Sequence, residues 1–403
     1  MPVRRTILQM NNTEVHIGAI ETTENGHRVA TTLQIGRNTH AVYVRSDNTL
    51  LSNDAGAFLV LALLPCMKTG SNLVVESEIS GRLLSHLETI QDIYCSWHPS
   101  LRRVRIQAPV GRPKAPPEGN RVATCFSAGV DSFYTLLKHR DEITDLVFVH
   151  GWDIDLEDRG LRRRSAERVR AIGAEFGKQV IELETNVGPF LCDYMRWGDL
   201  GHGAAIASAG LLLSALLRKI YIPSSHTYAH LFPWGTHPIL DPLWSTETLE
   251  FVHDGCEATR LQKVAKVAES DTAIQGLRVC LHPPEDTLNC GRCEKCVRTM
   301  IELHVAGVMD RCTAFGDKLT PESASKIIVR PDDVSTRAFI QENLDSLEAR
   351  GQDHQLCDAL RKALHPGRPW WQMKILRETR RILQQAQRVP QKASRLLRRS
   401  RQT

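Results

Sequence analysis

The sequence lacks the two commonest nucleotide-binding signatures. It contains neither a Walker lysine loop (G-x-x-x-x-G-K-[ST]) nor a dinucleotide fingerprint (G-x-G-x-x-G). It also lacks a hydrophobic run long enough to span a bilayer, because the longest apolar stretch covers only residues 203–217. Residues 1–6 contain no apolar segment of the kind a secretion signal requires. These absences predict a soluble cytoplasmic protein in which 203–217 forms a buried helix.

The length of the chain indicates more than one domain. A chain of 403 residues exceeds the usual span of a single hydrophobic core. Short β-branched runs and two helical patterns before residue 117 predict an N-terminal α+β accessory domain, and the prolines at 108–117 predict a linker. The expected regions are an accessory domain (1–117), a nucleotide domain with a cysteine cluster (118–300), a helical region (301–366) and a basic tail (367–403).

From residue 122 onward the pattern changes to strands that alternate with helices. Apolar runs at 146–150, 179–184 and 219–223 predict strands, and the intervening segments have helical periodicity. This alternation is typical of an α/β fold with a doubly wound parallel sheet. The carboxyl ends of such strands line up on one edge, where ligands bind. We expect the segment 223–238, which is rich in proline and aromatic residues, to fold over that edge.

The most specific segment follows the first of these strands. Small residues connect an apolar run to a helical pattern, so backbone N–H groups can approach an anion closely at a helix start. Asp131 is suited to cap the helix or to hold Mg²⁺. The alternative is an ordinary serine-rich helix cap. The residues expected to bind the nucleotide are Phe126, Ser127, Ala128, Gly129, Val130, Asp131 and Ser132.

A second specific pattern consists of four cysteines, Cys280, Cys290, Cys293 and Cys296. A C-x-x-C knuckle with two further thiolates predicts a closed, structural Zn²⁺ site. Disulfides are the competing interpretation, but the chain has eleven cysteines, an odd number, and no visible secretion signal. A redox pair formed by Cys293 and Cys296 is a further alternative.

The segment 127–132 resembles the SGGxDS loop of the N-type ATP pyrophosphatases, also called PP-loop or adenine nucleotide alpha hydrolase-like proteins. This resemblance implies a HUP-type nucleotide fold and an enzyme that breaks ATP between its α and β phosphates. Ala128 stands where the family usually has its first glycine. We expect Ala128 to have a negative φ, because a Cβ disfavours the left-handed region.

The loop and the cysteine cluster together resemble the 7-cyano-7-deazaguanine synthase family over about residues 120–300. This resemblance implies a structural zinc and an ATP-dependent adenylation of a carboxylate, or another carbonyl oxygen, that is then attacked by ammonia. The implied substrate is a small-molecule carboxylate or a nucleobase-like compound. One alternative is an RNA-modifying or sulfur-inserting PP-loop enzyme, for which Cys125 and Cys192 offer thiols. Another is a nonenzymatic nucleotide-binding adaptor.

Four residues are the candidates for catalysis: Asp131, His226, Arg260 and Lys263. Within 223–238 the histidines are suited to donate to an activated carboxylate or to shuttle a proton, and otherwise cap turns or fill gaps. PP-loop enzymes often use a cation downstream of such a segment to hold phosphate, which points to Arg260 and Lys263. The alternative for these two cations is a solvated helix face.

The last region concentrates the positive charge of the chain. Residues 368–403 carry a net charge of +10, so the remainder carries −5 although the whole chain is at +5. Such a tail is compatible with binding to nucleic acid, an anionic membrane or an acidic protein, with Trp370 and Trp371 as stacking residues. A solvated extension is the alternative. The sequence leaves the oligomeric state open, with a homodimer as one option.

Overall fold

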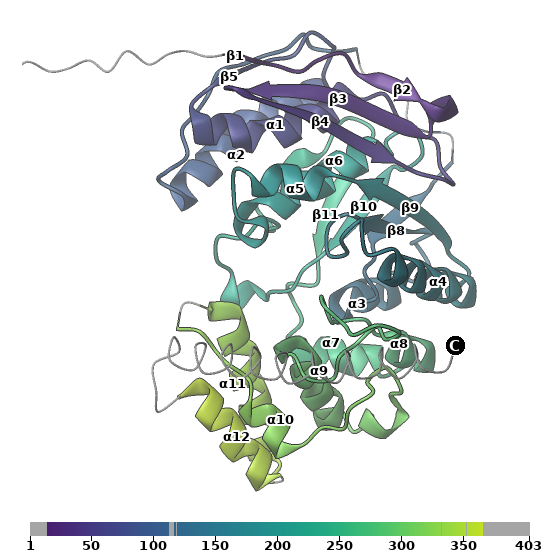
Figure 1. Ribbon diagram of the computed structural model, residues 1–403, viewed down its shortest axis with the longest axis vertical. Helices are drawn as coiled ribbons and strands as arrows, with labels where there is room; N and C mark the ends of the chain where they lie inside the picture. The colour runs from purple at the N-terminus through teal and green to yellow at the C-terminus, as the bar shows by residue number, and fades with distance from the viewer. Residues whose placement is uncertain (1–13, 113–116, 118, 332, 352, 366–403) are drawn as a thin grey trace, which may run out of the picture. The chain divides into compact units, whose positions relative to one another are not determined.

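The computed structural model describes residues 14–112, 117, 119–331, 333–351 and 353–365 (Figure 1). The chain divides into two compact units, the first formed by residues up to 290 with 308–316, and the second by 291–307 with the residues from 317 onward. Most of the expected linker is described, but 113–116 and the basic tail lie outside the described residues. A search of the described helices for a membrane-spanning segment finds none of sufficient length and apolarity.

The first unit is built around one eight-stranded sheet. Its strands are β2 (Glu21–Thr23), β3 (Arg28–Ile35), β4 (Asn38–Arg45), β7 (Val122–Cys125), β8 (Asp145–His150), β9 (Gln179–Thr185), β10 (Lys219–Pro223) and β11 (Glu250–Asp254). Their spatial order is β11-β10-β7-β8-β9-β4-β3-β2. The strands from β11 to β9 are parallel, which confirms the parallel sheet expected from the alternating pattern. The fold is therefore mixed α/β.

Three of the N-terminal strands, β2, β3 and β4, extend this sheet. Strand β4 pairs antiparallel with β9 through Val44↔Thr185 and Arg45↔Glu184, and β3 and β2 follow antiparallel. A smaller parallel sheet consists of β1 (Glu14–His16), β5 (Asn72–Val74) and β6 (Ile106–Gln107). The expected break at residue 117 therefore separates two segments that share a sheet.

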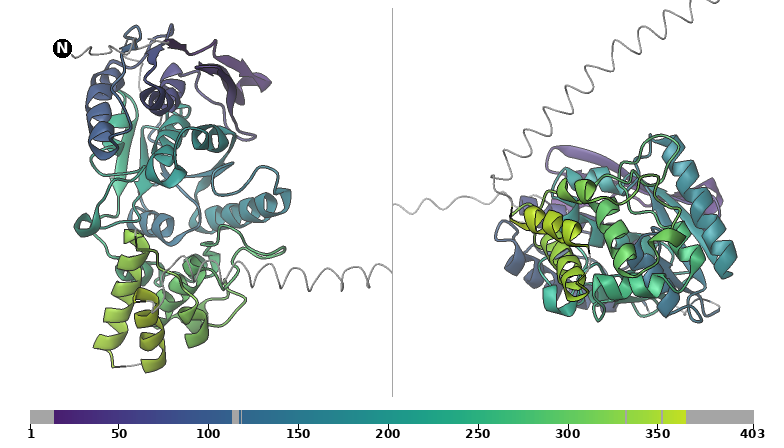
Figure 2. Two further views of the ribbon diagram at one scale, coloured as in Figure 1. Left: turned by 60° about the vertical axis from the view of Figure 1, so that its left-hand side comes forward. Right: turned by 90° about the horizontal axis from the view of Figure 1, so that it is seen from below.

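Helices cover both faces of the large sheet (Figures 1 and 2). They are α1 (Ala55–Thr69), α2 (Gly81–Trp97), α3 (Val130–Lys138), α4 (Arg159–Phe176), α5 (Val187–Cys192), α6 (His202–Leu211), α7 (Arg260–Val267) and α8 (Asp271–Gly276). On one side α3 contacts α7 and α4 contacts α8, whereas α1, α5 and α6 contact one another. Nearly every residue of α6 is buried, as expected for 203–217, although the helix ends at Leu211.

Local signals explain where these helices begin and end. The Asp54 carboxylate accepts a hydrogen bond from the Gly56 N–H at 2.8 Å and caps α1, which has a buried residue at nearly every position. Gly177 ends α4 with φ of +64°, a conformation that glycine adopts without a Cβ penalty. The two helices predicted before residue 117 and the helix predicted to end near Phe176 are thus confirmed.

The described part of the second unit is helical. It contains α9 (Glu294–Val305), α10 (Pro321–Ser325), α11 (Val334–Ala349) and α12 (His354–Leu364). Helices α11 and α12 pack side by side, as Figure 2 shows in yellow-green, and α11 also contacts α9. The Arg298 guanidinium lies 4.4 Å from the ring centroid of Phe339, which joins α9 to α11. The helical pattern expected after residue 301 is confirmed over these elements.

Candidate functional site

The loop predicted to bind phosphate lies between β7 and α3. The Phe126 N–H donates to the Val147 carbonyl at 2.8 Å, which holds the start of the loop against β8. The Gly129 N–H donates to Ser127 Oγ at 3.4 Å, and Gly129 is the N-cap residue of α3. The first N–H groups of a helix have no acceptor within that helix. The strand, the tight loop and the helix start therefore have the arrangement expected from the sequence.

Ala128 differs from the expectation. Its φ is +60°, in the left-handed region, and its side chain is completely buried. The Ala128 carbonyl accepts a hydrogen bond from the Arg278 N–H at 2.8 Å, a contact that fixes the peptide in this orientation. The left-handed conformation costs an L-residue about 1–2 kcal/mol. The prediction of a negative φ was wrong because a long-range hydrogen bond outweighs the local preference.

Three of the predicted catalytic residues lie together. Arg260 Nη1 is 2.9 Å from Asp131 Oδ1, and Lys263 Nζ is 3.6 Å from the same oxygen. Ser225 Oγ donates to the other oxygen, Asp131 Oδ2, at 3.1 Å. Both carboxylate oxygens therefore already face protein donors, so in this state Asp131 orients the two cations. A Mg²⁺ ion bound directly by Asp131 would compete with these contacts.

The two cations are presented by the first turn of α7. Thr259 forms a capping box with Gln262 and begins the helix, so Arg260 and Lys263 fall on one helical face at a spacing of three. Arg260 is 8% exposed and Lys263 is 1% exposed. Lys263 Nζ also donates to the Ser224 carbonyl at 2.5 Å, at the end of β10. The alternative of a solvated helix face is wrong for both residues, because solvated cations would be exposed.

The sequence-based prediction missed Arg278. Its side chain is 4% exposed, and among the described residues Nε and Nη2 have no hydrogen-bond acceptor. Burial lowers the pKa of this guanidinium, which Asp153 partly offsets. Because the Arg278 N–H binds Ala128, the residue lies directly against the loop. Its position two residues before Cys280 was the only sequence signal, and nothing local in the chain links that position to the loop.

His226 is close to the same network but is uncharged at neutral pH. Burial lowers the pKa of its imidazole to about 4, despite the nearby charge of Asp131. The ring centroid lies 4.6 Å from that of Phe232 and 5.8 Å from that of Trp234. Burial thus makes this imidazole a weak base, although a neutral ring still has one nitrogen that donates a hydrogen bond and one that accepts. Its assignment to catalysis stays a prediction.

The other histidines of segment 223–238 have different partners. His237 is buried, and its ring centroid lies 5.0 Å from that of Trp97. His230 is exposed and its Nδ1 is 3.1 Å from Thr227 Oγ1. These contacts match the alternative that we gave for them, namely turn capping and gap filling.

The thiols named for sulfur chemistry are poorly suited to it. Burial raises the pKa of the Cys125 thiol to about 12, and burial also raises the pKa of Cys192. The thiolate is the reactive form of cysteine. Neither residue therefore supplies a thiolate near neutral pH, and the structure gives no support to them as sulfur carriers.

The four cysteines of the predicted metal site form one cluster. The Sγ atoms of Cys280, Cys290, Cys293 and Cys296 all lie within 4.8 Å of one another. Tetrahedral Zn²⁺ with Zn–S bonds of about 2.3 Å places its sulfurs about 3.8 Å apart. Two of the residues are buried and two are half-buried. The donor set and spacing therefore fit a closed, structural Zn²⁺ site.

Asn289 organises the approach to this cluster and was not singled out from the sequence. Its Oδ1 accepts hydrogen bonds from the N–H groups of Val279 and Cys280 at 2.8 and 3.2 Å. Its Nδ2 donates to the carbonyls of Leu277 and Ala314 at 2.8 and 3.0 Å. This buried amide therefore joins the backbone of residues 277–280 to that of Ala314 beside the cluster. An asparagine beside a cysteine is too common for the sequence to reveal this role.

Comparison with protein-family models, curated proteins and solved structures finds no significant match to the chain.

Proposed function

We propose that this chain is an ATP-dependent ligase of the PP-loop class that adenylates a carboxylate, or another carbonyl oxygen, and transfers the activated carbon to a nitrogen nucleophile. The observation that carries the proposal is the set of buried cations around loop 126–132. The backbone N–H of Arg278 binds the Ala128 carbonyl, which anchors this buried cation's residue beside the loop. Arg260 and Lys263 reach the loop through Asp131. Buried positive charge next to the open N–H groups of a helix start favours a polyphosphate.

In the proposed reaction a carboxylate oxygen of the substrate attacks the α phosphorus of ATP. The bond to the bridging oxygen breaks, so pyrophosphate leaves and an acyl adenylate forms. Ammonia then attacks the carbonyl carbon, AMP leaves with the bonding electron pair, and the nitrogen loses a proton to give an amide. No covalent intermediate with the protein is required.

The residues have distinct parts in this proposal. The loop N–H groups and Arg278 bind the pyrophosphate as its negative charge grows, which is catalysis by preorganised electrostatics. Arg260 and Lys263, held by Asp131, contact the same phosphates. In this proposal the neutral His226 imidazole donates a hydrogen bond to the activated carboxylate, and the proton that the nitrogen loses passes to water. Bound Mg²⁺ would supply further neutralisation of phosphate charge, and Zn²⁺ would hold the segment that carries Arg278.

The decisive experiment identifies the products made from ATP. The full chain is incubated with ATP, Mg²⁺ and ammonium against a panel of carboxylates and RNA, and AMP with pyrophosphate is resolved from ADP with phosphate. We expect AMP and pyrophosphate with one of the carboxylates. Formation of ADP would refute the proposed cleavage. Product formation with RNA alone would favour the RNA-modifying alternative, and ATP binding without AMP release would favour the adaptor.

A matched pair of variants on α7 tests whether the buried cations take part. Arg260→Gln should reduce AMP formation by about tenfold or more, since a charge-assisted hydrogen bond to phosphate is lost. Lys266→Gln removes the same charge from the same helix, where Lys266 pairs with Glu269 at the surface. That control should retain the rate. Equal rates in both variants would remove Arg260 from the mechanism.

A further inference from the structure

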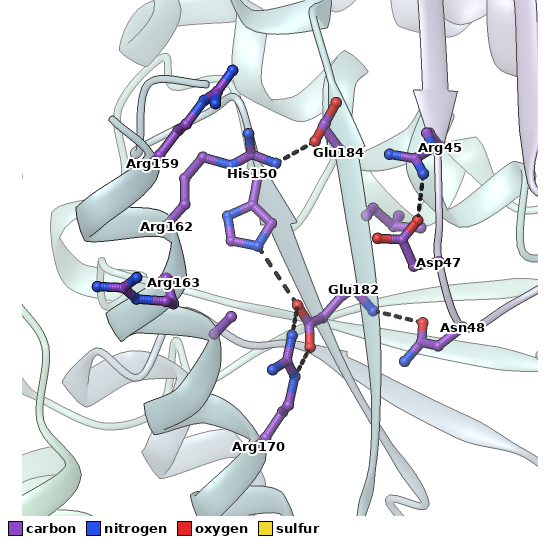
Figure 3. Close-up of a pocket in the computed structure, with 12 residues that line it drawn as sticks. Arg45, Asp47, Asn48, His150, Arg159, Arg162, Arg163, Arg170, Glu182 and Glu184 are labelled. Carbon is purple, nitrogen blue, oxygen red and sulfur yellow. Dashed lines mark hydrogen bonds and ion pairs between the residues drawn. The ribbon is translucent and has the colours of Figure 1, made fainter. Parts of the chain in front are cut away.

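A second group of cations lies around the N-terminal two-thirds of α4. Residues of β4, β8, β9, α4 and the turn after β4 line a cavity of about 550 Å³ (Figure 3). We call it the arginine cavity. Its lining residues are Arg45, Asp47, Asn48, His150, Arg159, Arg162, Arg163, Ala166, Arg170, Glu182, Leu183 and Glu184. None of the loop residues 126–132 belongs to this lining.

The charges in the arginine cavity do not balance. Five arginines and three carboxylates line the cavity, an excess of two positive charges among the lining residues, and Arg45 also pairs with Glu24, which lies outside the lining, at 2.7 Å. Each carboxylate is taken by one arginine: Arg45 Nη2 lies 2.7 Å from Asp47 Oδ1, Arg162 pairs with Glu184, and Arg170 Nη2 lies 3.0 Å from Glu182 Oε2. Figure 3 shows these pairs as dashed contacts.

The excess charge belongs to two exposed arginines. Among the described residues Arg159 forms no ion pair, and Arg163 comes no closer than 4.0 Å to a carboxylate, that of Glu167. Both residues lie in the first two turns of the 18-residue helix α4, together with Arg162. The helix dipole disfavours cations at this end. Three arginines concentrated there therefore create a positive potential that an anion would relieve.

A buried histidine forms part of the wall of the cavity. The His150 side chain is 8% exposed, and its Nε2 lies 3.7 Å from Glu182 Oε2. Its Nδ1 has no hydrogen-bond partner among the described residues. Figure 3 shows the ring between Arg162 and Glu182, on the lining of the cavity. The ring therefore adds a polar group to the cavity wall, while the cations of the lining are the groups that an anion would contact.

We propose that the arginine cavity binds the phosphate group of a small phosphorylated molecule. A phosphomonoester dianion matches the excess of two positive charges, and its three terminal oxygens accept hydrogen bonds from several guanidinium groups at once. The volume lies within the range of small-molecule sites, about 300–1,000 Å³. The cavity does not depend on the ligase activity proposed above, so either proposal can fail alone.

The test uses inorganic phosphate as the probe, titrated into the full chain by calorimetry at constant ionic strength. The double variant Arg159→Gln/Arg163→Gln removes the two excess charges at exposed positions, so folding should be unaffected. We expect phosphate affinity to fall by about tenfold or more, because charge-assisted hydrogen bonds are lost. The control Arg168→Gln removes a charge from the same helix outside the cavity, and should bind phosphate as the unmodified chain does.

The loop is a competing phosphate site, and Arg278→Gln separates the two. Phosphate binding that persists in Arg278→Gln and disappears in the double variant supports the arginine cavity. Binding that disappears in Arg278→Gln and persists in the double variant would overturn the proposal, as would equal losses in the double variant and in Arg168→Gln. A short RNA that binds the cavity while free phosphate and glycerol phosphate do not would also overturn it, since a polymer backbone would then be the ligand.

Discussion

The cations around the loop are buried, whereas several of those in the arginine cavity are exposed to solvent. Around the loop, Arg260, Lys263 and Arg278 are each at most 8% exposed, and Arg278 has a guanidinium with uncompensated nitrogens. In the arginine cavity, Arg163 and Arg170 are 73% and 59% exposed, and most of the charge is paired. Burying an unpaired cation lowers the free energy of unfolding, whereas an exposed cation changes it little. If both regions bind anions as proposed, binding at the loop should be tighter and binding at the cavity weaker and more sensitive to salt.

The largest effect on the difference between the two regions is expected from removing a metal bound by the four cysteines. A chelator, or Cys280→Ser, should release the segment that carries Arg278, since structural zinc contributes on the order of 10 kcal/mol in small domains. We expect ATP binding to be lost while phosphate binding at the arginine cavity persists. Metal analysis with parallel ATP and phosphate titrations measures both. Unchanged ATP affinity in metal-free, folded protein would contradict the link between the cluster and the loop.

Arg278→Met separates stability from binding. Replacing a buried charge that lacks partners with an apolar side chain of similar length should raise the free energy of unfolding by about 1–3 kcal/mol. If Arg278 has the proposed role, ATP affinity should fall by about a hundredfold, because the charge-assisted hydrogen bonds of its guanidinium to the phosphate are lost. Denaturant unfolding and ATP titration test the two effects. A variant that is destabilised and binds ATP normally would show that Arg278 is a structural residue.

Substitutions of Ala128 test how tightly the loop is constrained. Ala128→Val should reduce the free energy of unfolding by about 2 kcal/mol or more, because a β-branched side chain strongly disfavours φ of +60° and the position has no free space. Ala128→Gly should stay within about 1 kcal/mol, since relief of the backbone offsets the loss of a buried methyl. Equal stability of both variants in denaturant unfolding would argue against the left-handed conformation.

Acid should weaken the loop region through His226. The folded pKa of about 4 lies below the ordinary value of about 6.5, so the unfolded chain takes up the proton first as the pH falls. The stability from keeping His226 neutral is complete above about pH 6.5 and is lost progressively toward pH 4, by up to about 2–3 kcal/mol. His226→Gln should flatten this dependence. If the free energy of unfolding fell equally in the unmodified chain and in His226→Gln between about pH 7 and pH 4.5, His226 would not be the source of the acid sensitivity.

The smallest effect is expected for Arg170→Met in the arginine cavity. Its partner Glu182 is 15% exposed, but Arg170 itself is largely in solvent, so the pair should contribute less than about 1 kcal/mol. Unfolding at low and high salt measures this contribution, which salt should reduce further. If Arg170→Met changed the free energy of unfolding as much as Arg278→Met does, the proposed difference between the two regions would be wrong.

Patterns within short segments were predictable from the sequence. Apolar runs placed β8, β9 and β10 because buried parallel strands need continuous hydrophobic sequence. The small residues between Cys125 and Phe133 indicated a tight loop before a helix, and the cysteine spacing indicated the cluster that the Sγ distances support. In each case the signal and the structure it specifies lie within a few residues.

Contacts between distant segments were not predictable in this way. Strand periodicity located β4 but not its pairing with β9, because a strand pattern does not identify its neighbour. The sign of φ at Ala128 depends on a hydrogen bond from Arg278. The arginine cavity draws its lining from residues 45–48, 150, 159–170 and 182–184, and no local pattern marks it. Such features need the folded chain.

The pairing of β4 with β9 also governs how the protein can be shortened. A version that starts at residue 118 would leave β9 as an edge strand whose Glu184 and Thr185 have lost their antiparallel neighbours. An unprotected strand edge recruits other chains and promotes aggregation. The segment that carries β4 thus protects the edge of the parallel sheet, so attempts to express the chain from residue 118 alone should yield insoluble material.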